Sequence, residues 1–214
     1  MADQAEQDRR KRLLALLLLL LMEETGKQVD ALVLAWSVGG IGPDAFVNEL
    51  LGIVGGAHGQ ACYVGRQWGG VTEPLNENDA AFADSVVAEQ RPFAQGFASD
   101  LSAGRYGQPG GTGAAAPKAA QVQHRAAMYV DRVWGTAQEA WAMTLPEDTQ
   151  INWVLDPHEQ HHCEDCPKRA DGSPYTPATL PGVPGDGSTA CVTACRCHLE
   201  TTGGEQGPNT EGAA

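Results

Sequence analysis

The sequence predicts a mainly α protein in which a helical body is followed by a small irregular C-terminal module. Apolar residues recur at helical spacing through most of the first 150 residues, where no strand-like alternation of comparable length occurs. Five of the six cysteines then lie between residues 163 and 197, in a stretch rich in proline and glycine. Such a stretch has few side chains that could form a core, so we expect it to need a cross-link.

The composition excludes several classes of protein. The chain has 214 residues, with 14 Lys and Arg against 27 Asp and Glu, which gives a formal net charge of -13. This length corresponds to one or two domains. A general nucleic-acid-binding protein needs a positive face that displaces counterions from phosphates, so we expect no specific nucleic-acid partner. Collagen-like, coiled-coil and fully disordered chains have other compositions.

The N-terminal helical region, residues 1–103, begins with a basic cluster and a leucine run. Residues 9–12 read RRKR, and Leu13–Met22 are ten consecutive apolar residues. Secretory signal peptides share this order, but no small-x-small cleavage site follows. A ten-residue helix rises about 15 Å, half of the ~30 Å hydrocarbon thickness, so we expect no membrane span. We expect a helix buried on all sides by other helices or subunits, which favours a homo-oligomer or a multi-copy assembly.

Glycine and proline divide the next part of this region into helical segments. The apolar periodicity resumes at Val29–Trp36 after a break at Glu23–Lys27. Pro43 begins a second helix, because proline suits the first helical turn. The pattern continues through Ala57–Trp68, beyond two glycines that weaken it, and ends at the next glycine pair.

A third helix and a flexible segment complete this part of the chain. Asn78 and Asp79 can cap the third helix, and Pro92 is expected to kink or end it. Residues 104–117 are dominated by glycine, proline and alanine, which predicts a linker or an exposed loop.

Residues 118–150 contain the clearest helix, Lys118–Met143, and lead to the C-terminal module. Asn152–Leu155 is expected to form a short strand. The module covers residues 151–200 and contains the clustered cysteines. The last residues, 201–214, are rich in glycine and polar side chains, so we expect a mobile tail.

The cysteines of the module have the spacing of a metal site. The pattern is Cys163-x2-Cys166, then 24 residues, then Cys191-x3-Cys195-x-Cys197. A C-x2-C turn directs two thiolates toward one point, which suits a tetrahedral Zn2+ ion at a Zn–S distance of ~2.3 Å. Zinc binding can also supply folding energy that the intervening loop lacks. We predict one structural zinc ion, bound by Cys163 and Cys166 and by two of the other three cysteines.

Disulfide bonding in an oxidising compartment is an alternative use of these cysteines, and would indicate a secreted protein. Five clustered cysteines leave one unpaired, unless it reaches the distant Cys62. Cys62 itself lies in a helical apolar stretch, where we expect an inert core thiol. The C-x2-C spacing therefore favours zinc over disulfides.

A zinc-dependent peptidase is a second alternative. His158-Glu159-Gln160-His161-His162 matches the H-E-x-x-H motif, in which two His bind zinc and Glu polarises the bound water. Here the motif has room for little more than two helical turns, no amphipathic helix flanks it, and no clear third-ligand helix follows. We expect a polar turn beside a structural zinc site, and no catalytic residues.

The C-terminal segment resembles a known family. The residues that carry the resemblance are Trp153–Asp156 (WVLD), His162–Pro167 (HCEDCP), Gly172–Tyr175 (GSPY), Leu180–Gly185 (LPGVPG), Thr189–Cys191 (TAC) and Cys195–Leu199 (CRCHL). This pattern is similar to the C-terminal end of the minor head and head-morphogenesis proteins of tailed bacteriophages, in particular the phage Mu F-like family. Those proteins have a largely helical body, a Trp before a C-x-x-C, a Pro/Gly-rich loop and a closing C-R-C.

Two details bear on the resemblance. The helix around Tyr129–Trp141, with Arg132 and Gly135, also looks like the junction between the body and the zinc module in that family. The family usually has His-Pro and one further residue before C-R-C, whereas this chain has Cys191 four positions before Cys195. This departure leaves the fourth zinc ligand open.

The resemblance implies a non-enzymatic structural protein of the virion, in the head shell or near the portal vertex. Its partners would be portal, capsid or neck proteins, which it would contact through its helices during capsid assembly. The protein would be made in the host bacterial cytoplasm, where zinc binding is favoured over disulfides.

Overall fold

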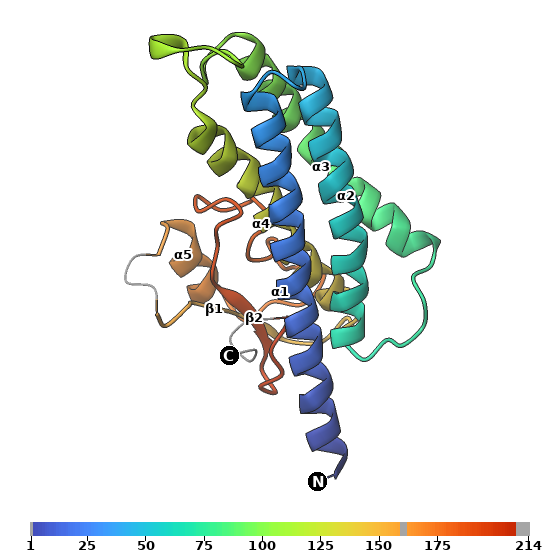
Figure 1. Ribbon diagram of the computed structural model, residues 1–214. Coiled ribbons are helices and arrows are strands. Elements are labelled where there is room, and N and C mark those ends of the chain that lie inside the picture. Colours follow the sequence, from blue (N-terminus) through green and yellow to red (C-terminus); the bar gives the residue numbers. More distant parts are fainter. Residues whose placement is uncertain (1, 159–161, 209–214) are drawn as a thin grey trace.

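The computed structural model describes residues 2–158 and 162–208 of the chain (Figure 1). Most of the described residues lie in four long helices, so the predicted mainly α fold class is confirmed. The elements in chain order are α1 (Ala2–Ser37), α2 (Pro43–Trp68), α3 (Glu77–Ser102), the short 3-10 helix η1 (Gly113–Ala115), α4 (Ala119–Ala142), β1 (Ile151–Val154), α5 (Asp165–Asp171) and β2 (His198–Thr201).

Helix α1 is continuous through Glu23–Lys27, where the apolar periodicity is interrupted. The polar residues of this turn support the helix instead of ending it. Glu23 and Lys27 form an i,i+4 ion pair at 2.7 Å, and the Thr25 hydroxyl donates a hydrogen bond to the Leu21 carbonyl oxygen at 2.7 Å. A change of polarity along a sequence does not by itself end a helix.

The leucine run of α1 is buried on one face only. Leu14, Ala15 and Leu18 point into the core and Leu21 and Met22 are half-buried, whereas five leucines are exposed to solvent, namely Leu13, Leu16, Leu17, Leu19 and Leu20. The expectation of burial on all sides is therefore wrong within the single chain. Among the described residues, no helix is long and apolar enough to cross a membrane.

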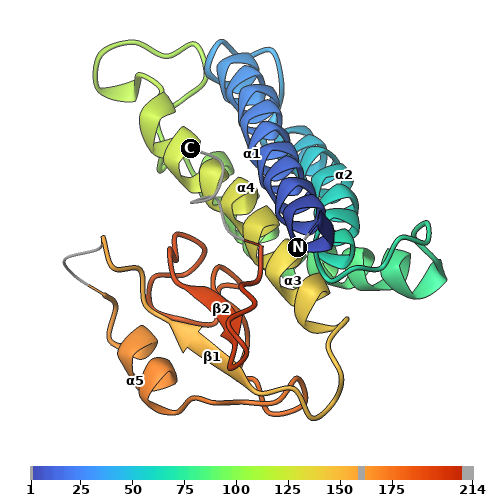
Figure 2. The same cartoon turned by 90° about the horizontal axis from the view of Figure 1, so that it is seen from below.

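Helix α2 occupies the centre of the body and packs against α1, α3 and α4, whereas α3 and α4 make few contacts with each other (Figures 1 and 2). Pro43 stands at the start of α2, as predicted, and Asp44 lies in its first turn. Gly65 allows α2 to approach α4 closely, because a Cβ at this position would collide with the carbonyl oxygen of Ala137.

Helix α3 has its N-cap at Asn76, two residues before the predicted cap at Asn78. The Asn76 side chain accepts hydrogen bonds from the backbone N–H groups of Asn78 and Asp79, and the Asp79 carboxylate accepts one from the Asn76 N–H. Pro92 does not end the helix, which runs on to Ser102. The residues beyond Pro92 include buried side chains such as Phe97, so core packing outweighs the hydrogen bond that proline lacks.

Residues 104–117 form a closed loop that is tied to the bundle. The Gln108 N–H donates to the Ala115 carbonyl oxygen at 2.8 Å, and the Lys118 N–H donates to that of Tyr106 at 2.7 Å. The Gly110 N–H donates to the carbonyl oxygen of Ser37, the last residue of α1, at 2.9 Å. This segment therefore connects α3 to α4 and does not separate two independent bodies.

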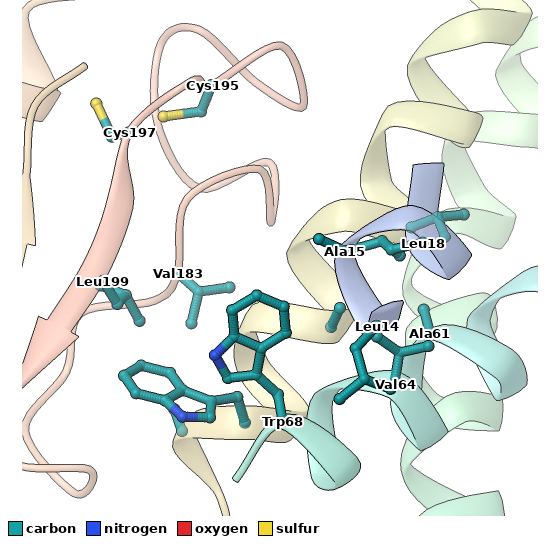
Figure 3. Close-up of a cluster of buried hydrophobic side chains, with 14 of the residues drawn as sticks. Leu14, Ala15, Leu18, Ala61, Val64, Trp68, Val183, Cys195, Cys197 and Leu199 are labelled. Carbon is teal, nitrogen blue, oxygen red and sulfur yellow. The ribbon is translucent and has the colours of Figure 1, made fainter. Parts of the chain in front are cut away.

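The C-terminal module packs on the helical body through a shared core (Figure 3). Figure 3 shows bundle residues such as Leu14, Val64 and Trp68 beside Val183 and Leu199 of the module. The buried residues of a second core cluster all lie in the four long helices. In this cluster Phe46 of α2 and Phe97 of α3 make a perpendicular ring contact. The body consequently has packing of its own, whereas the module depends on the body.

The module is built on the antiparallel pair β1–β2, with Trp153 opposite Leu199. The strand expected at 152–155 is therefore present, one residue earlier. Ile151 also pairs with Tyr175, which brings the loop after α5 back to β1. At Gly135 of α4 a Cβ would lie 2.6 Å from the Gly185 carbonyl group, so this junction requires close backbone contact between α4 and the module.

The residues after β2 do not form a free tail as far as the structure describes them. The Trp68 indole N–H donates to the Gln206 carbonyl oxygen, and the Gly207 N–H donates to that of Leu199, each at 2.8 Å. The Gln138 amide donates to the Pro208 carbonyl oxygen. The predicted mobile tail is thus corrected for residues 201–208, while 209–214 lie outside the described residues.

Candidate metal centre

Five thiols converge where α5 begins and where the chain enters β2. Cys163 and Cys166 lie just before and in the first turn of α5, and Cys195 and Cys197 directly precede β2. Cys191 belongs to the turn between them. The Asp165 carboxylate accepts a hydrogen bond from the Ala190 N–H at 2.8 Å, which fastens this turn to α5.

Cys166 is the centre of the cluster. Its Sγ atom lies 3.3 Å from that of Cys163, 3.6 Å from that of Cys195 and 3.8 Å from that of Cys191. Two groups of three thiols each have all Sγ atoms within 4.8 Å, and Cys166 belongs to both. The groups are Cys163, Cys166 and Cys191, and Cys166, Cys195 and Cys197. All five cysteines predicted from the sequence are therefore brought together, in an arrangement that could hold a metal ion.

Three of the distances are close to those of a tetrahedral thiolate site, although within the described residues no four thiols have all Sγ atoms within 4.8 Å of one another. Ligands at ~2.3 Å from a central ion lie about 3.8 Å from one another in a regular tetrahedron. The three separations measured from Cys166 are equal to this value or up to 0.5 Å shorter. They are far longer than the ~2.05 Å of a disulfide bond, and all six cysteines of the chain are free thiols.

The thiols influence the acidity of one another. Burial raises the pKa of Cys163, but hydrogen bonds from the backbone and thiol of Cys166 outweigh it and give a pKa of about 7. The contact with the Cys195 thiol lowers the pKa of Cys197 to about 5, against the effect of burial. Burial raises the pKa of Cys166, and the contact with Cys197 raises that of Cys195. Thiolates, the form that binds metal ions, are thus favoured at two of the five positions.

The long loop between the two cysteine pairs is held by polar contacts. Arg169 of α5 donates hydrogen bonds to Ser188 Oγ at 3.0 Å and to the Ser188 carbonyl oxygen at 2.9 Å. The same guanidinium lies over the Trp153 ring, 4.9 Å from its centroid. The Asp186 carboxylate accepts hydrogen bonds from the Val183 and Ser188 N–H groups. The loop also contributes Val183 to the core shared with the bundle, against which Tyr175 and Leu180 pack.

The H-E-x-x-H motif is only partly described. Glu159 to His161 lie outside the described residues, whereas His158 and His162 on either side are outside any helix. The His158 N–H donates to Asp156 Oδ1 at 2.8 Å, as in a turn. Within the part of the chain that the structure describes, neither His belongs to the groups of three possible metal ligands.

Cys62 is separate from the cluster. It is buried in α2, as expected for a core thiol, and its thiol contacts the Asp79 carbonyl oxygen at 3.9 Å. Burial raises the pKa of Cys62 to about 11, which keeps the thiol protonated and unreactive.

A buried polar network in the bundle was not foreseen from the sequence. His58 Nδ1 lies 2.8 Å from Thr136 Oγ1, and its Nε2 lies 2.7 Å from the Gln90 amide nitrogen. Burial, together with the charge of Arg132, lowers the pKa of His58 to about 3, so the ring is neutral. A single His in a helical stretch rich in small residues carries no pattern that distinguishes it from a surface residue.

No protein-family model, curated protein or solved structure matches the chain. The chemistry of the centre therefore follows from its own residues. Five clustered thiols, with no carboxylate or imidazole among the groups of three described ligands, form a soft sulfur site that could hold a metal ion.

Proposed function

We propose that this chain is a structural protein of a tailed-bacteriophage particle, a minor head or head–neck component that takes part in capsid assembly through its helices. In this proposal a structural zinc ion holds the C-terminal module. The observation that supports the metal site is the convergence of five thiols around Cys166 in a module that packs on a helical bundle.

Zinc fits the thiol cluster better than other metals. Tetrahedral sites with four sulfur ligands bind zinc or iron–sulfur clusters, and C-x2-C pairs joined by a longer loop are characteristic of structural zinc sites. Cys163 and Cys166 supply one pair, and two of Cys191, Cys195 and Cys197 complete the set. The fifth thiol is then not a ligand.

The role of the ion is structural in this proposal. Structural zinc sites have four protein ligands and no open position for substrate. Here the available thiols outnumber the four positions, so no water is needed to complete the coordination. Apart from the packing around Val183, the loop they enclose is held by hydrogen bonds of Arg169 and Asp186, so metal binding would contribute to the free energy that orders it.

The role in a virion rests on the resemblance of the C-terminal segment to phage minor head proteins. Two features of the chain are consistent with it. The outer face of the α1 leucine run is exposed, as expected of a subunit that is buried only in an assembly. The formal net charge of -13 favours solubility of the unassembled chain.

Metal analysis of the purified protein tests the zinc site. We expect about one zinc ion per chain, as a single four-ligand site requires. Cys166→Ser should abolish binding, because Cys166 belongs to both groups of thiols. Cys62→Ser and His162→Ala are matched controls that should retain the metal. A metal-free wild-type protein with oxidised thiols would refute the zinc site and favour disulfides.

Mass spectrometry of purified phage particles tests the role in the virion. Cells whose genome carries the coding sequence are induced, and the particles are separated from lysate by density. We expect the chain to co-purify with portal and capsid proteins in a constant ratio. Its presence only in the lysate fraction, and not in intact particles, would refute a structural role in the virion.

A further inference from the structure

An open groove runs along α4 between α3 and the C-terminal module, with a volume of about 890 Å3. It arises because α3 and α4 pack on α2 but make few contacts with each other. Apolar side chains dominate its walls, including Phe93 of α3, Met128 and Tyr129 of α4, and Val192 of the module. Phe93 is 69% exposed. An apolar groove between helices is a common binding site for the apolar face of another helix.

The exposed leucines of α1 form a stripe that has no partner in the single chain. Leu13, Leu16 and Leu20 are spaced at i, i+3 and i+7, so they lie on one face of the helix. Leu13 and Leu20 are 59% and 60% exposed, although Leu14 and Leu18 on the other face are buried. Leucines exposed together in this way indicate an interaction surface.

The leucine stripe has opposite charges at its two ends. Arg9 lies one helical turn before Leu13, and Glu24 lies one turn after Leu20, and both charged residues are exposed. The stripe is therefore positive at its N-terminal end and negative at its C-terminal end.

The groove has opposite charges at its ends as well. Glu139 lies near the C-terminal end of α4, and burial raises its pKa. Arg132 lowers this pKa, whereas the nearby carboxylates of Asp186 and Glu89 raise it. Glu89 and Asp186 line the groove at this end. Since Arg132 is paired with Glu139 at 3.3 Å, this end has a net negative charge.

The other end of the groove is positive. Arg125 of α4 lines it and pairs with Asp100 at 3.0 Å, but Arg105 pairs with the same carboxylate at 3.1 Å. The two arginines share one carboxylate, so together they keep one net positive charge. Lys118, another positively charged residue, lies directly before α4.

We propose that α1 of a second copy of this chain binds in the groove, antiparallel to α4, with its leucine stripe against the apolar walls. This orientation places Arg9 near Glu89 and Asp186, and Glu24 near Arg125. The stripe is short enough for the groove, because Leu13–Leu20 spans about 10 Å and the α4 wall from Ala120 to Arg132 spans about 18 Å.

The contact is head-to-tail, because the stripe and the groove are different surfaces of the chain. Contacts of this kind repeat from copy to copy and produce a ring if the rotation closes, or a filament if it does not. The inference deepens the proposed role in assembly by naming the contact between copies. It requires a folded module, which supplies Asp186 and Val192, but it does not depend on the role in the virion, so that role can fail while this contact holds.

Two variants, each altered on one of the two surfaces, test the proposal. Leu20→Asp places a charge in the leucine stripe, and Phe93→Asp places a charge in the apolar wall of the groove. Both side chains are exposed, so we expect both variants to fold. Molar mass is measured by light scattering after size exclusion, and circular dichroism confirms that each variant is folded. We expect the wild type to self-associate and each variant to do so at least about tenfold more weakly.

Mixing the two variants distinguishes the head-to-tail contact from others. Phe93→Asp still has an intact stripe and Leu20→Asp an intact groove, so the mixture should form a one-to-one dimer that does not grow. Leu34→Asp is the matched control, because Leu34 is 63% exposed on α1 but outside the stripe, and it should associate like the wild type.

The remaining outcomes each overturn the proposal. A monomeric wild type at concentrations up to the solubility limit shows that the groove does not bind a second copy. Self-association that survives in Phe93→Asp shows that the leucine stripes pair with each other. A mixture that remains monomeric excludes the head-to-tail contact. Metal content, measured on the same samples, reports separately on the zinc site.

Discussion

His58 of α2 and Thr136 of α4 lie 2.8 Å apart, from Nδ1 to Oγ1, with both side chains fully buried. Gln90 of α3 approaches the other ring nitrogen of His58, at 2.7 Å, so one imidazole connects three helices of the body. Because the Gln90 amide nitrogen is a donor, Nε2 must accept and Nδ1–H must donate to Thr136. The network therefore requires a neutral ring with a defined tautomer.

The buried His58 predicts that the protein loses stability in acid. Its pKa is about 3 in the folded state, against 6.5 for the free side chain, so below pH 6.5 the unfolded chain binds a proton that the folded chain excludes. Stability is full above pH 6.5 and falls as the pH decreases toward 3. Between pH 7 and pH 5 we expect a loss of about 2 kcal/mol in the free energy of unfolding from this group.

Urea denaturation at several pH values, with His58→Gln as the control, isolates this effect. Gln does not titrate, so the variant should lose less stability than the wild type over the same pH interval, whatever its stability at pH 7. Acid release of a metal ion would affect both proteins equally and cancels in the comparison. Equal pH dependence in both proteins would show that His58 is not held neutral.

Metal removal should unfold the module but not the bundle. The four long helices have a core cluster of their own, whereas the loop of the module is held largely by polar contacts around the cysteines. With a chelator we expect helical circular dichroism to be mostly retained, and amide hydrogen exchange in β1, α5 and β2 to become fast. Added Zn2+ should restore protection, and Mg2+, which prefers oxygen ligands, should not.

Single serine substitutions should also reveal the ligand set. Among Cys191, Cys195 and Cys197, one variant should retain zinc, because four of the five thiols suffice. Metal content and thermal stability of the three variants, measured side by side, decide which thiol is not a ligand. Loss of zinc from all three would mean that the ion is not bound by four sulfur atoms as proposed.

Gly65→Ala should destabilise the bundle. The added Cβ would meet the Ala137 carbonyl oxygen, and would lie 2.9 Å from the Ala140 Cβ and 3.0 Å from the Trp141 nitrogen, so α2 and α4 would have to separate. We expect a cost of about 1–3 kcal/mol in the free energy of unfolding. Gly56→Ala on the same helix meets nothing within 4 Å and should stabilise by up to about 1 kcal/mol. Chemical denaturation of both variants checks the contrast.

Gly207→Ala should release the residues after β2. A Cβ there would lie 2.7 Å from the Trp141 ring and 2.8 Å from Gln138 Oε1, and both side chains are fully buried. We expect lower stability and faster proteolysis at the C-terminal end. Gly203→Ala is the control, because its nearest neighbour is Thr201 Oγ1 at 3.6 Å. Equal proteolysis of the two variants would contradict the docking of this segment.

Features that depend on neighbouring residues were predictable from the sequence. Pro43 begins α2, and the helix expected at Lys118–Met143 appears as Ala119–Ala142, because proline geometry and apolar periodicity act within a few residues. The thiol cluster was predictable for a related reason. A C-x2-C spacing brings two thiolates together wherever the rest of the chain folds.

Other features depend on contacts between residues far apart in the chain, and no local pattern indicates them. Residues 201–208 have the composition of a mobile tail, yet Trp68 and Gln138 of the bundle bind them. The leucine run has no polar face in the sequence, so only the packing of α2 and α4 determines that Leu14 is buried and Leu13 exposed.

The sequence by itself determined the α class, most of the helix boundaries and the five candidate metal ligands, because propensity, capping and ligand spacing are local properties. The tertiary structure alone decided which face of α1 is exposed, that the module shares a core with the bundle, and that His58 is neutral. Burial and desolvation are properties of the packed chain, and they depend on partners that are distant in sequence.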